Sequence, residues 1–288
     1  MKKVALGTVQ FGIDYGINNS RGKIPENEVY QILDEAYNAG IDILDTAHAY
    51  GNSEELIGRF ISRNNKYFRV VSKLPACKID NIEDVITGSL NRLNLERLYG
   101  YIIHDFLFYK ENPEIIDILK QFKDKNKIRK IGFSLYYPHE LEYLLENEKE
   151  IDLIQVPYNI FDRRFEKYFK AVKERQIELH VRSVFLQGLF FKDINDLNPH
   201  FTGIKDKLIE IKKIAQDSNI PIEAVCLNFA LLEDNIDKTI VGIDSVENLK
   251  NIINTVKYQN KTRDVLENLN ELEEHDENIL VPFKWVLE

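Results

Sequence analysis

The sequence predicts an α/β protein built as a closed (β/α)8 barrel, the TIM-barrel architecture. Short apolar runs alternate along the whole chain with longer segments of helical period, which is the pattern of βα units around a parallel sheet. Eight such runs occur, and eight strands close a barrel of this class. The stretch 6–12 after the first run lacks the Gly-rich phosphate turn of a doubly wound sheet and is not expected to open a helix. These observations favour the closed barrel over the open sheet.

The predicted strands are short, and most of them end in a polar residue or glycine. In chain order they are Val4–Gly7, Ile41–Asp45, Arg69–Lys73, Tyr101–His104, Lys130–Ser134, Leu153–Val156, Glu178–Ser183 and Thr239–Gly242. Amphipathic segments between them predict the return helices, several of which begin with proline or an acidic residue. These segments include Glu28–Ala39, Val85–Leu93, Pro113–Phe122, Glu140–Leu145, Arg164–Glu174, Ile204–Ala215 and Val246–Val256.

The chain is expected to form one domain over residues 1–288. Its length suits a single α/β barrel, which takes roughly 250 residues. No linker rich in Ser, Pro or Gly divides it. Residues 262–288 are expected to form a C-terminal extension, in which a capping helix precedes an extended segment that ends near Trp285.

Charge and composition exclude several classes of protein. The 38 basic and 47 acidic residues give a net charge of −9, so a general attraction to nucleic acid is not expected. Cys77 and Cys226 have no second ligand at metal-binding spacing, which argues against a disulfide framework or a zinc site. No apolar run approaches the roughly 18 residues of a membrane span, and no signal peptide is recognisable. We therefore expect a cytoplasmic protein without a metal, a nucleic-acid partner or a membrane anchor.

Four polar side chains stand at or near the ends of apolar runs. Asp45, Lys73 and His104 end three predicted strands, and Tyr50 lies in the loop after Asp45. In an α/β barrel the active site forms at the carboxyl ends of the strands. One polar residue at a strand end is most often structural, but four that face one pocket indicate catalysis.

These four residue types suit the polarisation of a carbonyl group. A tyrosine whose pKa is about 10 is a poor acid at neutral pH unless a cation stabilises its phenolate, and Lys73 supplies a cation. Asp45 would pair with Lys73 and hold its ammonium group charged and oriented. His104 would donate a hydrogen bond to the substrate oxygen. The set predicts that Tyr50 delivers a proton to oxygen while hydride reaches carbon from a nicotinamide.

The segment 45–54 reads D-T-A-H-A-Y-G-N-S-E. It resembles the D-T-A-x-x-Y-G-x-S-E signature of the aldo-keto reductase family, and the likeness extends over nearly the whole chain. The resemblance implies that Asp45, Tyr50, Lys73 and His104 are the catalytic tetrad of that family. It also implies an NAD(P)-dependent oxidoreductase that acts on a small-molecule carbonyl compound.

The same resemblance implies a set of cofactor contacts. Ser134 and Gln155 stand where the family binds the nicotinamide carboxamide, which needs both donors and acceptors. Arg182 stands where many members carry an aromatic ring against the nicotinamide, and a planar guanidinium can stack there instead. Residues 183–189 resemble a loop that binds the pyrophosphate through backbone N–H groups. The implied cofactor-binding residues are Gly7, Thr8, Ser134, Gln155, Arg182, Ser183, Leu186, Gly188, Gly242 and Asp244.

Asp244 departs from the family pattern. Many members carry Lys or Arg after the last strand, where it binds the adenosine 2′-phosphate of NADP. A carboxylate repels that phosphate but can hydrogen-bond a free ribose 2′-hydroxyl, as acidic residues do in NAD-binding proteins. Weak NADPH binding, use of NADH and compensation by Lys250 stay open on this evidence, so the expected cofactor is NADP or NAD.

The sequence therefore predicts NAD(P)H-dependent reduction of an aldehyde or ketone, with Tyr50 as the general acid. The segment 6–17 resembles a bacterial branch linked with surface carbohydrates, which points to a keto-sugar or sugar nucleotide as one substrate class. A redox-neutral nicotinamide-dependent sugar epimerase and a non-catalytic, nucleotide-sensing regulatory protein are the alternative interpretations. Residues 9–11 and 190–201 are expected on the substrate side of the pocket, and residues 106–109 are either pocket wall or core.

Overall fold

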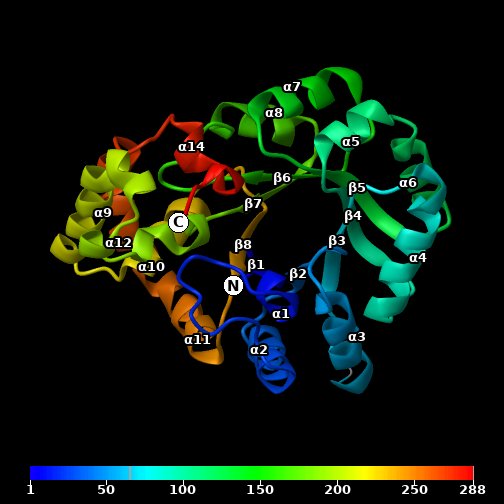
Figure 1. Cartoon of the computed structure of the whole chain (residues 1–288), viewed down its shortest axis with the longest axis horizontal. Coiled ribbons are helices and arrows are strands. Elements are labelled where there is room, and N and C mark those ends of the chain that lie inside the picture. Colours follow the sequence, from blue (N-terminus) through cyan, green and yellow to red (C-terminus); the bar gives the residue numbers. More distant parts are fainter. Residues whose placement is uncertain (65, 288) are drawn as a thin grey trace.

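The computed structural model describes residues 1–64 and 66–287. Within these residues, eight parallel strands close into a barrel in which each strand pairs with the next and β1 pairs with β8 (Figure 1). The strands are β1 (Val4–Gly7), β2 (Ile43–Asp45), β3 (Arg69–Leu74), β4 (Leu98–Ile103), β5 (Ile128–Ser134), β6 (Leu153–Pro157), β7 (Glu178–Arg182) and β8 (Lys238–Gly242). The predicted (β/α)8 fold is confirmed, and every predicted strand overlaps an observed one.

Helices surround the barrel on its outer side (Figure 1). In the described residues they are α1 (Val9–Gly12), α2 (Glu26–Asn38), α3 (Ser53–Asn64), α4 (Ile82–Leu93), α5 (Phe106–Glu111), α6 (Ile115–Asp124), α7 (Pro138–Asn147), α8 (Phe169–Glu174), α9 (Lys205–Asp217), α10 (Ile222–Leu231), α11 (Val246–Thr255), α12 (Gln259–Asp264), α13 (Leu266–Asn270) and α14 (Glu277–Leu280). The helices have one apolar face each in most cases; α2, for example, buries Val29, Ile32, Leu33 and Ala36. This spacing places all four on one side of the helix, against the sheet. Within these residues, no helix is both long and apolar enough to cross a membrane.

Two local expectations were wrong. The stretch after β1 does open a short helix, α1, because the Phe11 side chain is buried in the core and Gly12 packs against the backbone of Tyr50. The end of the chain is not extended throughout, since Pro282–Lys284 forms a 3₁₀ turn. The Trp285 indole N–H holds that turn in place by donating to the Ile279 carbonyl at 2.8 Å.

The alternation of side chains along the strands places the candidate site. A separate apolar cluster draws on six strands. Besides Tyr99 of β4, it contains Ala5, Ile43, Val71, Ile102, Leu153 and Ile240. Two positions further along the chain from these six stand Gly7, Asp45, Lys73, His104, Gln155 and Gly242, of which His104 lies just after the end of β4. Because alternate residues of a strand point to the same side, this second set lies one layer nearer the carboxyl ends, on top of the apolar cluster.

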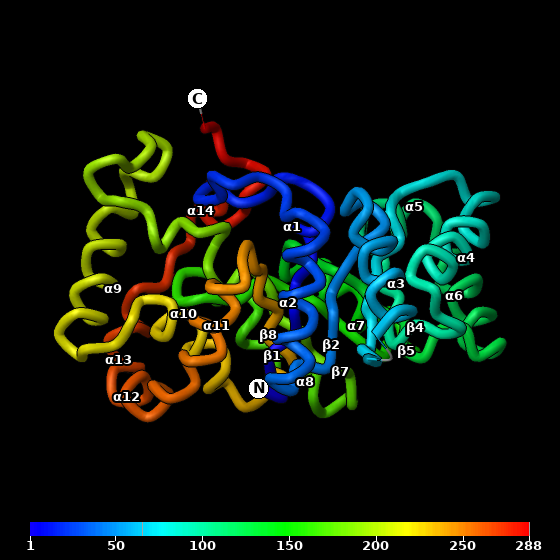
Figure 2. The backbone as a smooth tube through the Cα atoms, turned by 90° about the horizontal axis from the view of Figure 1, so that it is seen from below, coloured from blue at the N-terminus to red at the C-terminus, as the bar shows by residue number. Residues whose placement is uncertain are grey.

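The C-terminal extension lies at the same end of the barrel as these residues. Figure 2 shows α14 and the chain end beside the segment around α1, with the N-terminus at the opposite end. The ring of Phe283 packs edge-on against Tyr136 with centroids 5.1 Å apart, and Trp285 packs against Phe201 at 4.9 Å. We therefore propose that the extension belongs to the same domain as the barrel.

Candidate active site

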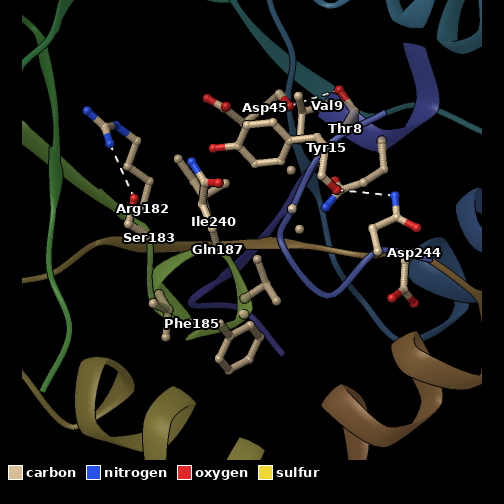
Figure 3. Close-up of a pocket in the computed structure, with 18 of the residues that line it drawn as sticks. Thr8, Val9, Tyr15, Asp45, Arg182, Ser183, Phe185, Gln187, Ile240 and Asp244 are labelled. Atoms are coloured by element: carbon tan, nitrogen blue, oxygen red, sulfur yellow. Dashed lines mark hydrogen bonds between the residues drawn. The ribbon is translucent and has the colours of Figure 1, made fainter. Parts of the chain in front are cut away.

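A cavity of about 340 Å³ opens at the carboxyl ends of the strands. Figure 3 shows side chains from β2, β7 and β8 and from the segments that follow β1 and β7 converging on it. Its lining includes most of the residues singled out in the sequence, namely Gly7, Thr8, Asp45, Tyr50, His104, Ser134, Gln155, Arg182, Ser183, Gly188, Gly242 and Asp244. Among the described residues, no group of three or more His, Cys, Asp or Glu side chains is arranged to hold a metal ion.

Lys73 and Asp45 form a buried ion pair beneath the cavity. The Lys73 ammonium donates to the Asp45 carboxylate and, at 2.9 Å, to the Thr46 carbonyl. The second oxygen of Asp45 accepts a hydrogen bond from the Gln155 amide at 2.7 Å. Burial by itself lowers the pKa of Lys73, but the charge of Asp45 and the nearby Tyr50 outweigh it, so the pKa of Lys73 is raised. The lysine therefore stays charged.

The Tyr50 hydroxyl lies 3.4 Å from the Lys73 ammonium. Burial raises the pKa of Tyr50, and the positive charge of Lys73 opposes that effect. Tyr50 consequently keeps its proton at neutral pH. It also has a cation beside the oxygen that becomes negative when the proton leaves.

His104 follows β4 and stands edge-on to Tyr50, with ring centroids 6.2 Å apart. Burial lowers the pKa of His104 to about 3, and the positive charges of Lys73 and Arg182 contribute to this shift. The ring is therefore neutral over the physiological range, and a neutral imidazole keeps one N–H donor.

Two glycines fix the loop that carries Tyr50. A Cβ added at Gly12 would lie 1.7 Å from the Tyr50 carbonyl oxygen, so only glycine allows α1 to approach this loop. Gly51 has a φ of +52°, and a Cβ there would lie 2.4 Å from the Gly12 oxygen. The Ser53 N–H then donates to the Tyr50 carbonyl at 3.0 Å and begins α3. Side chains larger than glycine at either position would displace Tyr50.

The loop after β7 has an unusual backbone that faces the cavity. Ser183, Leu186 and Gln187 have φ values of +62°, +45° and +51°, and Gly188 has +95°. Left-handed residues of this kind turn neighbouring N–H groups toward one side and form concavities that bind anions. The Ile17 N–H donates to the Gln187 carbonyl at 3.1 Å, so the segment after α1 is joined to this loop.

Arg182 is held at the end of β7 by three contacts. Its guanidinium lies over the Tyr136 ring at 4.2 Å from the centroid, donates to the Leu135 carbonyl at 2.9 Å and approaches the Ser183 hydroxyl at 3.3 Å. Within residues 1–64 and 66–287, no carboxylate forms an ion pair with it. The guanidinium therefore brings an uncompensated positive charge to the cavity.

The opposite side of the cavity, beside β8, is acidic. Asp244 lines it, and the Arg21 guanidinium donates to the Asp244 backbone carbonyl at 3.2 Å. Arg21 also forms a two-bond ion pair with Glu28, with distances of 3.1 and 2.6 Å. Lys250 lies 3.8 Å from Glu35, so it is directed to another carboxylate.

A family model for the aldo/keto reductase family matches residues 3–274, which is most of the chain. The chain belongs to the aldo/keto reductase family. As a member it is an NAD(P)-dependent oxidoreductase, as the sequence resemblance implied.

Three proteins similar to this aldo/keto reductase share 20–24% of their residues with it. An uncharacterized oxidoreductase of Bacillus subtilis is 23% identical over 296 residues and covers 93% of this chain and 95% of its own. D-arabinose 1-dehydrogenase of Saccharomyces cerevisiae is 24% identical over 250 residues, covering 76% of this chain and 73% of its own. The holo structure of an aldo-keto reductase from Bacillus halodurans superposes with a TM-score of 0.75 at 20% identity, covering 96% of this chain and 95% of that one.

Several predicted cofactor-binding residues make hydrogen bonds or packing contacts within the protein itself. The Thr8 hydroxyl donates to the Asp45 backbone carbonyl at 2.9 Å, which ties the ends of β1 and β2 together. The Gln155 amide nitrogen donates a hydrogen bond to the Asp45 carboxylate. The side chain of Leu186 is buried in the core and does not line the cavity. Ser134 lines the cavity from β5 as expected.

The cavity also contains residues that were not among the predicted site residues. Tyr15, Tyr136 and Gln187 line it, and Arg21 stands beside Asp244. Burial raises the pKa of Tyr15 to about 12, with a smaller contribution from Tyr50. Aromatic and amide side chains in the segments that follow β1, β5 and β7 were the available signal, because such loops line the active end of a barrel.

The substrate-side expectations are resolved in part. Val9 and Gln10 line the cavity, whereas Phe11 is core. From the stretch 190–201 the cavity wall includes Phe191. In the stretch 106–109, which was either wall or core, Phe106 and Tyr109 are buried core residues, and none of the four lines the cavity.

Proposed function

We propose that this aldo/keto reductase reduces the carbonyl group of a small sugar-like aldehyde or ketone with NADH, and that Tyr50 is the general acid. The observation that carries the proposal is the position of the Lys73 ammonium, which bonds both Asp45 and the Tyr50 hydroxyl. Such a group stabilises negative charge on the tyrosine oxygen only when the proton leaves, which is the requirement for catalysis.

The proton transfer follows from the geometry of these side chains. A carbonyl oxygen placed between Tyr50 and His104 would accept hydrogen bonds from both. Tyr50 gives its proton to that oxygen as the oxygen gains negative charge, and the resulting phenolate is stabilised by Lys73. Asp45 keeps Lys73 charged and oriented through the cycle. His104, being neutral, orients the carbonyl without competing as a proton donor.

The cavity suits a nicotinamide dinucleotide, which supplies the hydride when bound. The buried Gln10 amide oxygen has no hydrogen-bond partner in the described chain, and such an atom favours a ligand with a donor group. The left-handed loop 183–188 offers backbone N–H groups to a pyrophosphate. Ser134 would contact the carboxamide, and Gly7 and Gly242 leave room for the dinucleotide. We call the side with Tyr50 the catalytic end and the side with Asp244 the adenosine end.

The balance of charge at the adenosine end supports NADH. Arg21 contributes one positive charge, and Glu28 and Asp244 contribute two negative charges, which leaves one negative charge. Arg21 forms an ion pair with Glu28 at 2.6 Å and Lys250 lies 3.8 Å from Glu35, so each cation already has a carboxylate beside it. A lone carboxylate there repels the phosphate of NADPH and accepts a hydrogen bond from the ribose of NADH.

The remaining lining supports a polyhydroxylated substrate. Tyr15, Asn18 and Asn19 line the cavity together with Tyr136 and Gln187, so hydroxyl and amide groups are available for sugar hydroxyls. The yeast relative named D-arabinose 1-dehydrogenase, at 24% identity, also acts on a sugar by its name. A keto-sugar or a sugar nucleotide satisfies these features.

The test is turnover of a panel of aldehydes, ketoses and keto-sugar nucleotides with NADH, in the parent and in Tyr50→Phe. We expect oxidation of NADH with at least one compound and a loss of about 10²- to 10⁴-fold in kcat in the variant, with nucleotide affinity retained. Epimer formation without net NADH consumption would establish the epimerase alternative. Tight nucleotide binding with no turnover by either protein over the panel would favour the regulatory alternative.

A further inference from the structure

The catalytic end of the pocket carries an excess of one positive charge. Lys73 is neutralised by Asp45, with which it shares a buried ion pair. His104 is neutral because burial and the nearby cations lower its pKa. The Tyr15 and Tyr50 hydroxyls keep their protons because burial raises the pKa of each. The positive charge of the Arg182 guanidinium is therefore the one that no neighbouring group in the described residues neutralises.

Arg182 cannot easily move its charge out of the pocket. One face of the guanidinium rests on Tyr136, and its edge donates to the Leu135 carbonyl. Tyr136 in turn packs against Phe283 of the C-terminal extension, with ring centroids 5.1 Å apart. Figure 3 shows the Arg182 side chain and the Tyr15 ring in the same part of the pocket, away from Asp244. These contacts therefore hold the positive charge of Arg182 at the catalytic end.

We propose that Arg182 makes the site selective for the reduced form of the nicotinamide cofactor. This inference rests on the proposed function, which puts the nicotinamide at the catalytic end. The dihydronicotinamide ring is uncharged. When it gives up a hydride, which carries two electrons with one hydrogen, the ring becomes a pyridinium with one positive charge. A fixed guanidinium beside the ring repels the oxidised form and leaves the reduced form unaffected.

The rest of the dinucleotide does not change between the two forms. The pyrophosphate, both riboses and the adenine are identical, so their contacts with the loop 183–188 and with Asp244 cancel in the ratio of the two dissociation constants. That ratio reports the surroundings of the ring, and the Arg182 variants isolate the contribution of the guanidinium charge to it. At an effective dielectric constant of about 20, two unit charges that lie within about 10 Å of each other would repel by more than about tenfold in affinity.

The consequence concerns the working direction of the enzyme. A protein catalyst leaves the overall equilibrium between free reactants unchanged. Tight binding of NADH and weak binding of NAD⁺ fill the site with the hydride donor and speed the departure of the spent cofactor. The alcohol-oxidising direction would require a high concentration of NAD⁺. The pocket is therefore suited to carbonyl reduction.

The experiment is calorimetric titration of the whole protein with NADH and with NAD⁺, in the absence of any carbonyl substrate. We expect NADH to bind at least about tenfold more tightly than NAD⁺ in the parent. Arg182→Met should bring the two dissociation constants within about threefold of each other, chiefly by strengthening the binding of NAD⁺. Arg182→Lys, which keeps the charge but not the planar stack on Tyr136, should preserve most of the preference.

Arg21→Met is the matched control. It removes one arginine charge from the adenosine end, so it should alter the affinities for NADH and NAD⁺ by the same factor and leave their ratio at the parental value. Thermal unfolding of each variant establishes that it is folded, and Arg182→Gln replaces Arg182→Met should the latter fail to fold.

The outcomes separate this inference from the proposed function. Equal affinity of the parent for the two redox forms overturns the inference and leaves carbonyl reduction intact. A parental ratio that survives in Arg182→Met also overturns it, because the selectivity then has another cause. Absence of binding by either nucleotide refutes the proposed function, and the inference falls with it.

Discussion

The two ends of the pocket differ in the sign of their charge and in their exposure to solvent. At the catalytic end the side chains of Lys73 and Asp45 are only 1% and 5% exposed, and the excess charge is positive. At the adenosine end the side chain of Arg21 is 54% exposed, and the excess charge is negative. Charges interact strongly in a buried site and weakly where water and salt screen them.

This difference teaches what each end can control. Under the proposed function, buried charges at the catalytic end would act on the reacting atoms and on the preference for one redox form of the ring, so substitutions there should change rates by orders of magnitude. Exposed charges at the adenosine end would act on a part of the cofactor remote from the chemistry, so substitutions there should change the choice between NADH and NADPH and leave the rate at saturation nearly unchanged.

The largest effect is expected from Lys73→Met. Loss of the ammonium removes the stabilisation of the Tyr50 phenolate, so kcat should fall by about 10²- to 10⁴-fold. The Asp45 carboxylate is then buried without its partner, which should lower the free energy of unfolding by about 3–5 kcal/mol. Single-turnover kinetics and urea unfolding measure the two effects.

A matched control removes a lysine from the other end of the same barrel. Lys130 lies near the start of β5, four positions before Ser134, and forms an ion pair with Glu178 at the start of β7. Lys130→Met should lower stability but preserve kcat. Equal rates in the parent and in Lys73→Met would contradict the role assigned to Lys73. They would also remove the contrast between the catalytic end and the adenosine end of the pocket.

A smaller effect is expected from Asp244→Arg at the adenosine end. The change replaces a charge that repels the 2′-phosphate with one that attracts it, so NADPH should bind about 10- to 100-fold more tightly and NADH nearly as before. The gain should shrink at high salt, because this end is exposed. Fluorescence titration at two salt concentrations measures both. Asp217→Arg, on the exposed end of α9, is the control, and tighter binding of NADPH than NADH by the parent would overturn the prediction.

The same contrast explains which parts of the molecule were predictable from the sequence. Asp45, Lys73 and His104 were found because a strand has a period of two, so a polar residue that closes an apolar run falls at the carboxyl end of the barrel. The positions of these three residues are therefore encoded locally. The helix α3 was not predicted, because the signature motif runs into its first turn. Its residues Leu56, Ile57, Phe60 and Ile61 nevertheless have helical spacing.

The adenosine end was predicted less well because its contacts are long-range. Arg21 and Asp244 are 223 positions apart, and no local pattern signals that a loop after β1 reaches the loop after β8. The support of Arg182 has the same character, since Tyr136 and Phe283 come from separate loops. Their proximity follows from how the barrel closes and how the C-terminal extension folds back, which depends on tertiary packing.

The smallest effect is that of pH on stability, and it acts on the catalytic end. Among the described residues that line the pocket, His104 is the one histidine. Its pKa is about 3 in the folded protein, whereas an unfolded histidine titrates near 6.5. The unfolded chain therefore takes up a proton below pH 6.5 that the folded protein refuses, so stability falls as the pH is lowered from 6.5 toward 3.

The test compares the parent with His104→Gln, which keeps a hydrogen-bond donor but cannot titrate. Between pH 7 and pH 5 the parent should lose about 1–2 kcal/mol more free energy of unfolding than the variant, because a one-proton difference is worth at most about 1.4 kcal/mol per pH unit. Urea unfolding at the two pH values measures the difference. Parallel losses in the two proteins would mean that His104 is accessible enough to be protonated in the folded state, and the excess positive charge assigned to the catalytic end would then rise on acidification.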